Sequence, residues 1–217
     1  MFIPIFTHAE SDKKLFYKYL FEEEYLQRWG HVKNTIIEIY PELSLLLKDS
    51  KTKAESKNVI EKYITNLYHR YQKPLSQLIE SLQIKFNNKK QAIEKAFSAT
   101  MDTDMTNFSL EIILSLFTKS LFGEKNIILS VAPDIIQGKQ RPYSSIILHE
   151  ITHIARNSKL HGSYGNDALP LSSIAKDDLK EIVAPIILRN EHFNDILDSK
   201  AFREANQKQK MLTIQVK

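Results

Sequence analysis

The residues His149-Glu150-Ile151-Thr152-His153 form an HExxH box, and this box constrains the 217-residue chain more than any other feature. On a helix, side chains at positions i and i+4 lie above one another on the same face. Two imidazoles at that spacing can bind one Zn²⁺. Glu150 lies about a third of a turn away from His149, where its carboxylate can take a proton from a metal-bound water. The box therefore predicts a helix that carries a metal site.

The flanks of the box predict that this helix is buried. Apolar residues cover most of its circumference: Ile146, Ile147, Leu148, Ile151 and Ile154. Pro142 is suited to the first turn of the helix, and Asn157 with Ser158 indicates its end. Three titratable side chains in a buried helix are costly unless they are paired or bound to a metal. The alternative is a buried helix whose histidines only hydrogen-bond to their neighbours.

Composition limits the partners and the chemistry. Hydrophobic residues make up 42% of the chain and charged residues 26%, which is typical of a globular protein. The net charge of +4 is dispersed, and lysines between Lys48 and Lys57 alternate with acids, so a solvated face is predicted rather than a nucleic-acid surface. The chain has no cysteine, so a zinc site must use histidine and carboxylate ligands.

The sequence shows no targeting or membrane segment. Residues 1–6 are apolar but brief, lack a basic stretch before them, and lead directly into His8, Glu10 and Asp12. No uninterrupted apolar stretch approaches the roughly 20 residues of a membrane span. We therefore expect a cytoplasmic protein without a membrane partner, although export without a signal peptide would leave no mark in the sequence.

Hydrophobic periodicity predicts an α+β fold that is mainly helical. An i, i+3, i+4, i+7 stripe from Ile60 to Tyr71 predicts a tyrosine-rich helix, and residues 15–29 and 32–47 are also predicted as helices, with a break at Pro41. Leu82, Ile84 and Phe86 alternate with polar residues, so a strand is an alternative there. The polar segment 99–107 is the predicted boundary between a helical region, 1–104, and a second domain, 105–217. In that domain we expect a helix over 107–122, a strand over 127–131, the box helix over 143–157 and a helix from Asp178.

A catalytic zinc needs a third protein ligand beside the two histidines. Glu181 follows His153 by 28 positions (181 − 153) on the last predicted helix, and His161 follows it by 8 (161 − 153) in a predicted loop. Asp177 and Asp178 are further candidates. Asp178 and Glu181 also have the spacing of a capping box, which would give Glu181 a purely structural role.

With this pattern the chain resembles the zincin metallopeptidases, and among them the gluzincins. The resemblance rests on the HExxH box and on a glutamate in a later helix, and it covers residues 105–190. It implies that His149, His153 and Glu181 bind Zn²⁺ and that Glu150 is the general base. The order helix, strand, box helix and glutamate helix also resembles the minimal gluzincin core, in which the strand is an edge that binds an extended peptide.

The resemblance implies a zinc-dependent peptidase with a peptide or protein as its substrate. Glu150 would pass the proton of the attacking water to the leaving amine, and His161 or Tyr164 would stabilise the oxyanion. The alternative is a non-catalytic module, zinc-stabilised or metal-free, that binds a peptide or another protein. A further alternative is a zymogen-like state, in which residues 1–10 or 200–217 lie in the cleft.

Overall fold

The computed structural model describes residues 1–102, 104–123, 126–163, 183–193 and 196, and of residues 156–163 it describes the backbone alone. Helices make up most of these residues, and the others include a four-stranded sheet, so the predicted mixed and mainly helical fold is confirmed. The chain divides into two compact units. We call Pro4–Gln83 with Leu110–Arg141 the sheet unit, and Met1–Ile3, Ile84–Ser109 and Pro142–Lys217 the box unit. Both units draw on residues from either side of position 104, where the sequence predicts its boundary.

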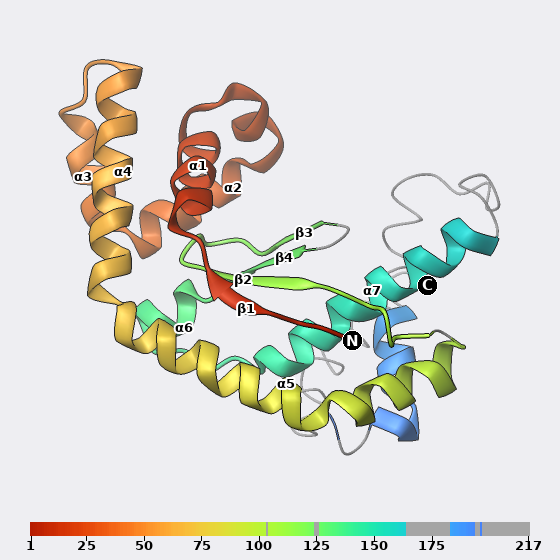
Figure 1. The fold of residues 1–217 in the computed structure, drawn as a ribbon. Helices are drawn as coiled ribbons and strands as arrows, with labels where there is room; N and C mark the ends of the chain where they lie inside the picture. Colours follow the sequence, from red (N-terminus) through yellow and green to blue (C-terminus); the bar gives the residue numbers. More distant parts are fainter. Residues whose placement is uncertain (103, 124–125, 164–182, 194–195, 197–217) are drawn as a thin grey trace. The chain divides into compact units, whose positions relative to one another are not determined.

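The sheet lies within the sheet unit and is mostly parallel. Its strand order is β1 (Ile5–Thr7), β2 (Glu111–Ser115), β4 (Asn126–Ser130) and β3 (Leu121–Phe122), with only β3 antiparallel to its neighbour (Figure 1). In the central pair, Ile112 lies beside Ile127 and Leu114 beside Leu129, and all four side chains are fully buried. Near-continuous apolar runs of this kind are typical of parallel strands that are covered on both faces.

Two predictions for this region are wrong. The predicted helix over 107–122 is replaced by the strands β2 and β3. The mostly apolar segment from Leu110 to Leu114 is too short to distinguish the 3.6-residue period of a helix from the two-residue period of a strand. It becomes a strand because it pairs with β4. The strand predicted over 127–131 is confirmed as β4, but it is not an edge. It pairs with β2 on one side and with β3 on the other, so its backbone is not free to bind an extended peptide along its whole length.

Five further helices lie entirely within the described part of the sheet unit, and several of them begin or end at a recognisable sequence signal. They are α1 (Ala9–Phe21), α2 (Glu23–Ile39), α3 (Pro41–Lys48), α4 (Lys53–Arg70) and α6 (Ala132–Gln137). The predicted break at Pro41 is confirmed, because this proline begins α3. The tyrosine-rich helix is confirmed as α4, which begins with a capping box between Thr52 and Glu55. Gly138, at φ 67°, ends α6 in the left-handed conformation.

Helix α5 (Gln72–Met101) is continuous, so the alternative of a strand near Ile84 is wrong. Its buried apolar side chains recur at intervals of seven and four, a helical spacing: Leu75, Leu82, Phe86, Ile93 and Phe97. The helix contributes its first part to the sheet unit and its second part to the box unit. Among the described residues, no helix is long and apolar enough to cross a membrane.

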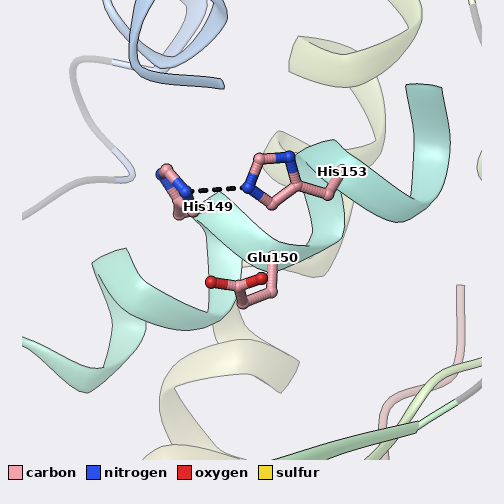
Figure 2. A group of neighbouring side chains, drawn as sticks. All are labelled: His149, Glu150 and His153. Atoms are coloured by element: carbon pink, nitrogen blue, oxygen red, sulfur yellow. Dashed lines mark hydrogen bonds between the residues drawn. The ribbon is translucent and has the colours of Figure 1, made fainter. Parts of the chain in front are cut away.

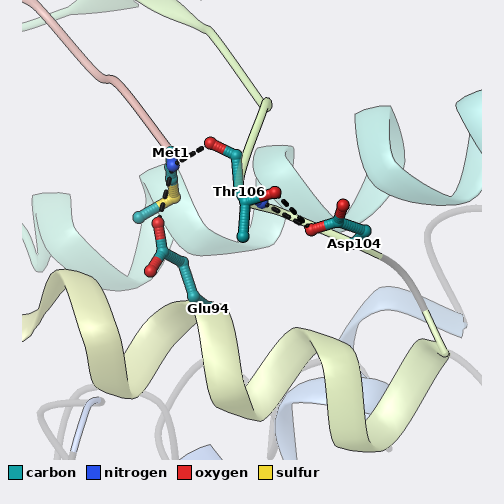
Figure 3. A network of polar contacts seen from close by, with 4 residues as sticks. All are labelled: Met1, Glu94, Asp104 and Thr106. Carbon is teal, nitrogen blue, oxygen red and sulfur yellow. Dashed lines mark hydrogen bonds and ion pairs between the residues drawn. The ribbon is translucent and has the colours of Figure 1, made fainter.

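Polar contacts hold the N-terminal residues against α5 within the box unit (Figure 3). The amino group of Met1 donates to Glu94 Oε1 at 2.6 Å and to the carbonyl of Thr106 at 2.7 Å. Asp104 Oδ1 accepts from the backbone N–H of Thr106 at 2.8 Å and from its hydroxyl at 2.7 Å. These two hydrogen bonds lower the pKa of Asp104 and order the turn that faces Met1.

The sheet unit contains a fully buried carboxylate, Asp12 of α1. Its Oδ2 accepts from the backbone N–H of Leu116 at 2.8 Å, the N–H of Phe117 at 3.1 Å and the hydroxyl of Tyr68 at 2.8 Å. The hydroxyl of Ser115 donates to Oδ1. The carboxylate thus ties α1 and α4 to the end of β2, where the chain leaves the sheet and its N–H groups have no strand partner.

We expect Asp12 to make the protein less stable as the pH rises. Burial raises the pKa of Asp12 to about 6 from an ordinary value of 3.8, and hydrogen bonds from Ser115, Tyr68 and the two backbone N–H groups oppose that rise. At pH values between 3.8 and about 6, the unfolded chain has released a proton that the folded chain retains. The free energy of unfolding therefore falls as the pH rises through this range. The loss from this group is about 3 kcal/mol, complete above a pH near 6.

Chemical denaturation of the wild type and of Asp12→Asn at pH 4 and pH 7 measures this contribution, because the difference between the two proteins cancels the other titrating groups. We expect the wild type to lose stability relative to the variant between the two pH values. An unchanged difference would show that Asp12 keeps an ordinary pKa in the folded protein.

Candidate metal site

The HExxH box lies on α7 (Tyr143–Ser163), so the predicted box helix is confirmed and runs beyond Asn157 and Ser158. Its first hydrogen bond joins the N–H of Ile146 to the carbonyl of Pro142, as expected for a helix that starts after a proline. The buried face carries apolar residues that are at most 1% exposed: Ile147, Leu148, Ile151 and Ala155. On this side α7 packs against α5 within the box unit, where Ser144 and Leu148 border a small gap next to Phe86 and Ile93. Packing against α5 therefore fixes which side of α7 carries the box.

The two histidines of the box point toward each other (Figure 2). His149 Nε2 and His153 Nε2 lie 2.9 Å apart, and the ring centroids are 4.6 Å apart at an interplanar angle of 83°. Side chains on a helix lean toward its N-terminus, so the ring of His153 reaches back over the turn that carries His149. Both rings are partly exposed. The arrangement therefore brings the two Nε2 atoms together on one face of α7.

Glu150 completes a three-residue group on the neighbouring part of the helix circumference (Figure 2). Its side chain is 9% exposed, and ligand atoms of His149, Glu150 and His153 all lie within 4.8 Å of one another. A carboxylate this well covered beside two imidazoles gains from a nearby cation. Among the described residues, this is the group of histidine and acidic side chains whose spacing suits a metal ion.

The donor set fits a zinc ion. Two imidazole nitrogens at zinc–nitrogen distances of 2.0–2.1 Å in a tetrahedral site are about 3.4 Å apart. The observed 2.9 Å between the Nε2 atoms is close to this value, so a small rotation of one ring would suffice. Without an ion, one ring must donate a proton to the other, which requires a single pair of tautomers. Imidazole nitrogens suit several divalent transition metals, zinc among them.

The other candidate residues are placed differently from the prediction or lie outside the described residues. His161 was predicted in a loop, which is wrong, because α7 continues to Ser163. Its backbone therefore lies roughly 12 Å further along the helix axis than that of His153. Tyr164, Asp177, Asp178 and Glu181 lie outside the described residues. Residues 183–188, which begin two positions after Glu181, are helical as predicted.

The sequence did not predict two features of the sheet unit, a buried acid and a cluster of cationic and aromatic residues. Asp12 stands in register with Phe16 and Tyr19 on the buried face of α1, and an acid on an apolar stripe was the available signal. Arg28, Trp29 and Lys119 come together only in the folded chain, because 90 residues (119 − 29) separate the last two.

Comparisons of the chain with protein-family models, with curated proteins and with solved structures find no match. The assignment of the site therefore rests on this chain's own residues and on their geometry.

Proposed function

We propose that the protein is a zinc-dependent peptidase of the HExxH type. The observation that carries the proposal is the pair of facing imidazoles of His149 and His153, with the covered carboxylate of Glu150 beside them on the same helix. A metal site built only for stability has no need of a carboxylate beside the ion that can exchange a proton with a bound water. Glu150 fits the part of a general base.

When bound, zinc would lower the pKa of a water molecule and polarise the carbonyl of the substrate. His149 and His153 would hold the ion through Nε2, and their rings would fix its position relative to Glu150. The carboxylate of Glu150 takes a proton from the attacking water and passes it to the nitrogen of the leaving amine. Its apolar surroundings on α7 limit the access of bulk water, so the proton stays with the reacting groups.

The third ligand in this proposal is Glu181, which comes two positions before the helical residues 183–188 in the sequence. It would complete a set of two histidines and one glutamate and leave one coordination position open for water. Tyr164 is the proposed donor of a hydrogen bond to the oxyanion, since the backbone of His161 lies roughly 12 Å further along α7 than that of His153.

Elemental analysis of the purified protein tests the metal site directly. We expect about one zinc ion per chain in the wild type and a loss of that zinc in both His149→Ala and Glu181→Ala, since each substitution removes a ligand. His69→Ala removes an exposed histidine of α4 and serves as the matched control, which should keep its zinc.

Two results would contradict the proposed site. Zinc lost in His149→Ala but retained in Glu181→Ala would move the third ligand to Asp177 or Asp178. A wild type that binds no metal after zinc is added would leave a buried helix with hydrogen-bonded histidines, and a module that binds a peptide or protein would become the better explanation.

A further inference from the structure

Two cationic side chains share one aromatic ring in the sheet unit, far from the box in sequence. Lys119 Nζ lies 3.0 Å from the centroid of the Trp29 ring, and Arg28 Cζ lies 5.3 Å from it. Tyr19 is the second ring beside Lys119, with 6.0 Å between its centroid and Nζ. We call Tyr19, Arg28, Trp29 and Lys119 the Trp29 cluster.

The backbone conformation near Trp29 and the packing of Tyr19 position the residues of this cluster. Helix α2 is interrupted at Trp29, whose φ of −133° and ψ of 33° are not helical. Tyr19 is held in place by Phe117 and Tyr25, at centroid distances of 5.0 and 4.9 Å. Trp29 and Lys119 are half-buried, while Arg28 is exposed. The cluster is therefore an ordered surface feature with aromatic walls.

The positive charges of Arg28 and Lys119 are not balanced by an acid among the residues that the structure describes. Burial and the nearby charge of Arg28 lower the pKa of Lys119, and no acid contributes in the other direction. Among the ion pairs of the described residues, none within 4.0 Å includes Arg28 or Lys119. Two neighbouring cations without an anion repel each other, and partial burial strengthens the repulsion.

We propose that the Trp29 cluster binds a small phosphate-type oxyanion, with Arg28 and Lys119 as its two cationic ligands. A multiply charged anion that contacts both side chains would replace their repulsion with charge-assisted hydrogen bonds. Arginine supplies a planar fork that suits phosphate oxygens, and lysine supplies a compact point charge. The aromatic walls lower the local dielectric constant and so strengthen both contacts. This site is independent of the proposed zinc site.

Fluorescence of Trp29 reports directly on the cluster, because the chain has a single tryptophan. The full-length protein is titrated with sodium pyrophosphate and, separately, with sodium chloride at matched ionic strength. We expect a saturable change with pyrophosphate and only a small, non-saturating change with chloride. Because bound anion stabilises the folded state, the melting temperature should rise over the same concentration range.

Charge-removing variants identify the ligands. Lys119→Met keeps the packing of the side chain on Trp29 and removes its charge, and Arg28→Gln does the same for arginine. Each should weaken pyrophosphate binding by about tenfold or more. Lys62→Ala removes an equal charge from an exposed position on α4 and should bind as the wild type does.

The same titrations can overturn the proposal. Equal responses to pyrophosphate and chloride would show ordinary screening of two surface charges. Binding that is unchanged in Lys119→Met and in Arg28→Gln would place the anion elsewhere. Circular dichroism of each variant confirms that it is folded, so a loss of binding reports on the cluster.

Discussion

Under the proposed mechanism of a zinc peptidase, Glu150→Gln is expected to abolish peptide cleavage while leaving the zinc content unchanged. Glutamine has nearly the same shape as glutamate but cannot accept the proton of the attacking water, so the general-base contribution is lost. That contribution is about 10²–10⁴-fold in rate. Glu150 lies beside the two histidines rather than between them, so its substitution removes neither of the two Nε2 atoms proposed to bind the metal. Zinc content and the rate of cleavage of a mixed peptide library are measured on the same preparation.

The control for this substitution is Glu80→Gln, which makes the same chemical change at an exposed position of α5. It should leave both zinc content and rate unaffected. A Glu150→Gln variant that cleaves as fast as the wild type would rule out Glu150 as the general base. A variant that loses its zinc together with its activity would instead make Glu150 a metal ligand.

Asp12→Ala is expected to cause the largest loss of stability, about 3–5 kcal/mol, because it leaves several buried donors without an acceptor. The backbone N–H groups of Leu116 and Phe117 have Asp12 Oδ2 as their acceptor, and the hydroxyls of Ser115 and Tyr68 also donate to this carboxylate. The removed side chain also leaves a gap in a fully buried site. Denaturation by urea at neutral pH measures the free energy of unfolding.

Asp12→Asn separates the hydrogen bonds from the charge. The amide oxygen can still accept from Leu116 and Phe117, and the amide nitrogen can donate to the hydroxyl of Ser115. We expect this variant to be much more stable than Asp12→Ala at neutral pH, since it resembles the protonated acid. Equal losses in the two variants would show that the carboxylate itself, rather than its acceptor geometry, is required.

The candidate metal site was accessible from the sequence because its geometry is local. The i, i+4 spacing of His149 and His153 and the apolar residues around them predict a buried helix with two imidazoles on one face, and the structure confirms this. The third ligand depends on a later segment that is not adjacent in sequence. Glu181 therefore remains a prediction.

Only part of the sheet could be predicted from the sequence. The strand at 126–130 is short, rich in isoleucine and leucine, and bounded by turn residues, which is a local signal. The segment 110–117 carries a similar apolar run, and its strand conformation follows from pairing with β1 and β4. Such pairing joins residues more than one hundred positions apart (Ile112 and Ile5), so no window of sequence contains it.

By itself, the sequence determined the helical majority of the fold, the break at Pro41 and the three side chains of the box, because capping, proline geometry and helical periodicity act within a few residues. Tertiary structure alone decided the strand over 111–115, the burial of Asp12 under four donors, and the meeting of Lys119 with Trp29. Each of these depends on which distant segments pack together, since burial and pairing are properties of the whole chain rather than of its local pattern.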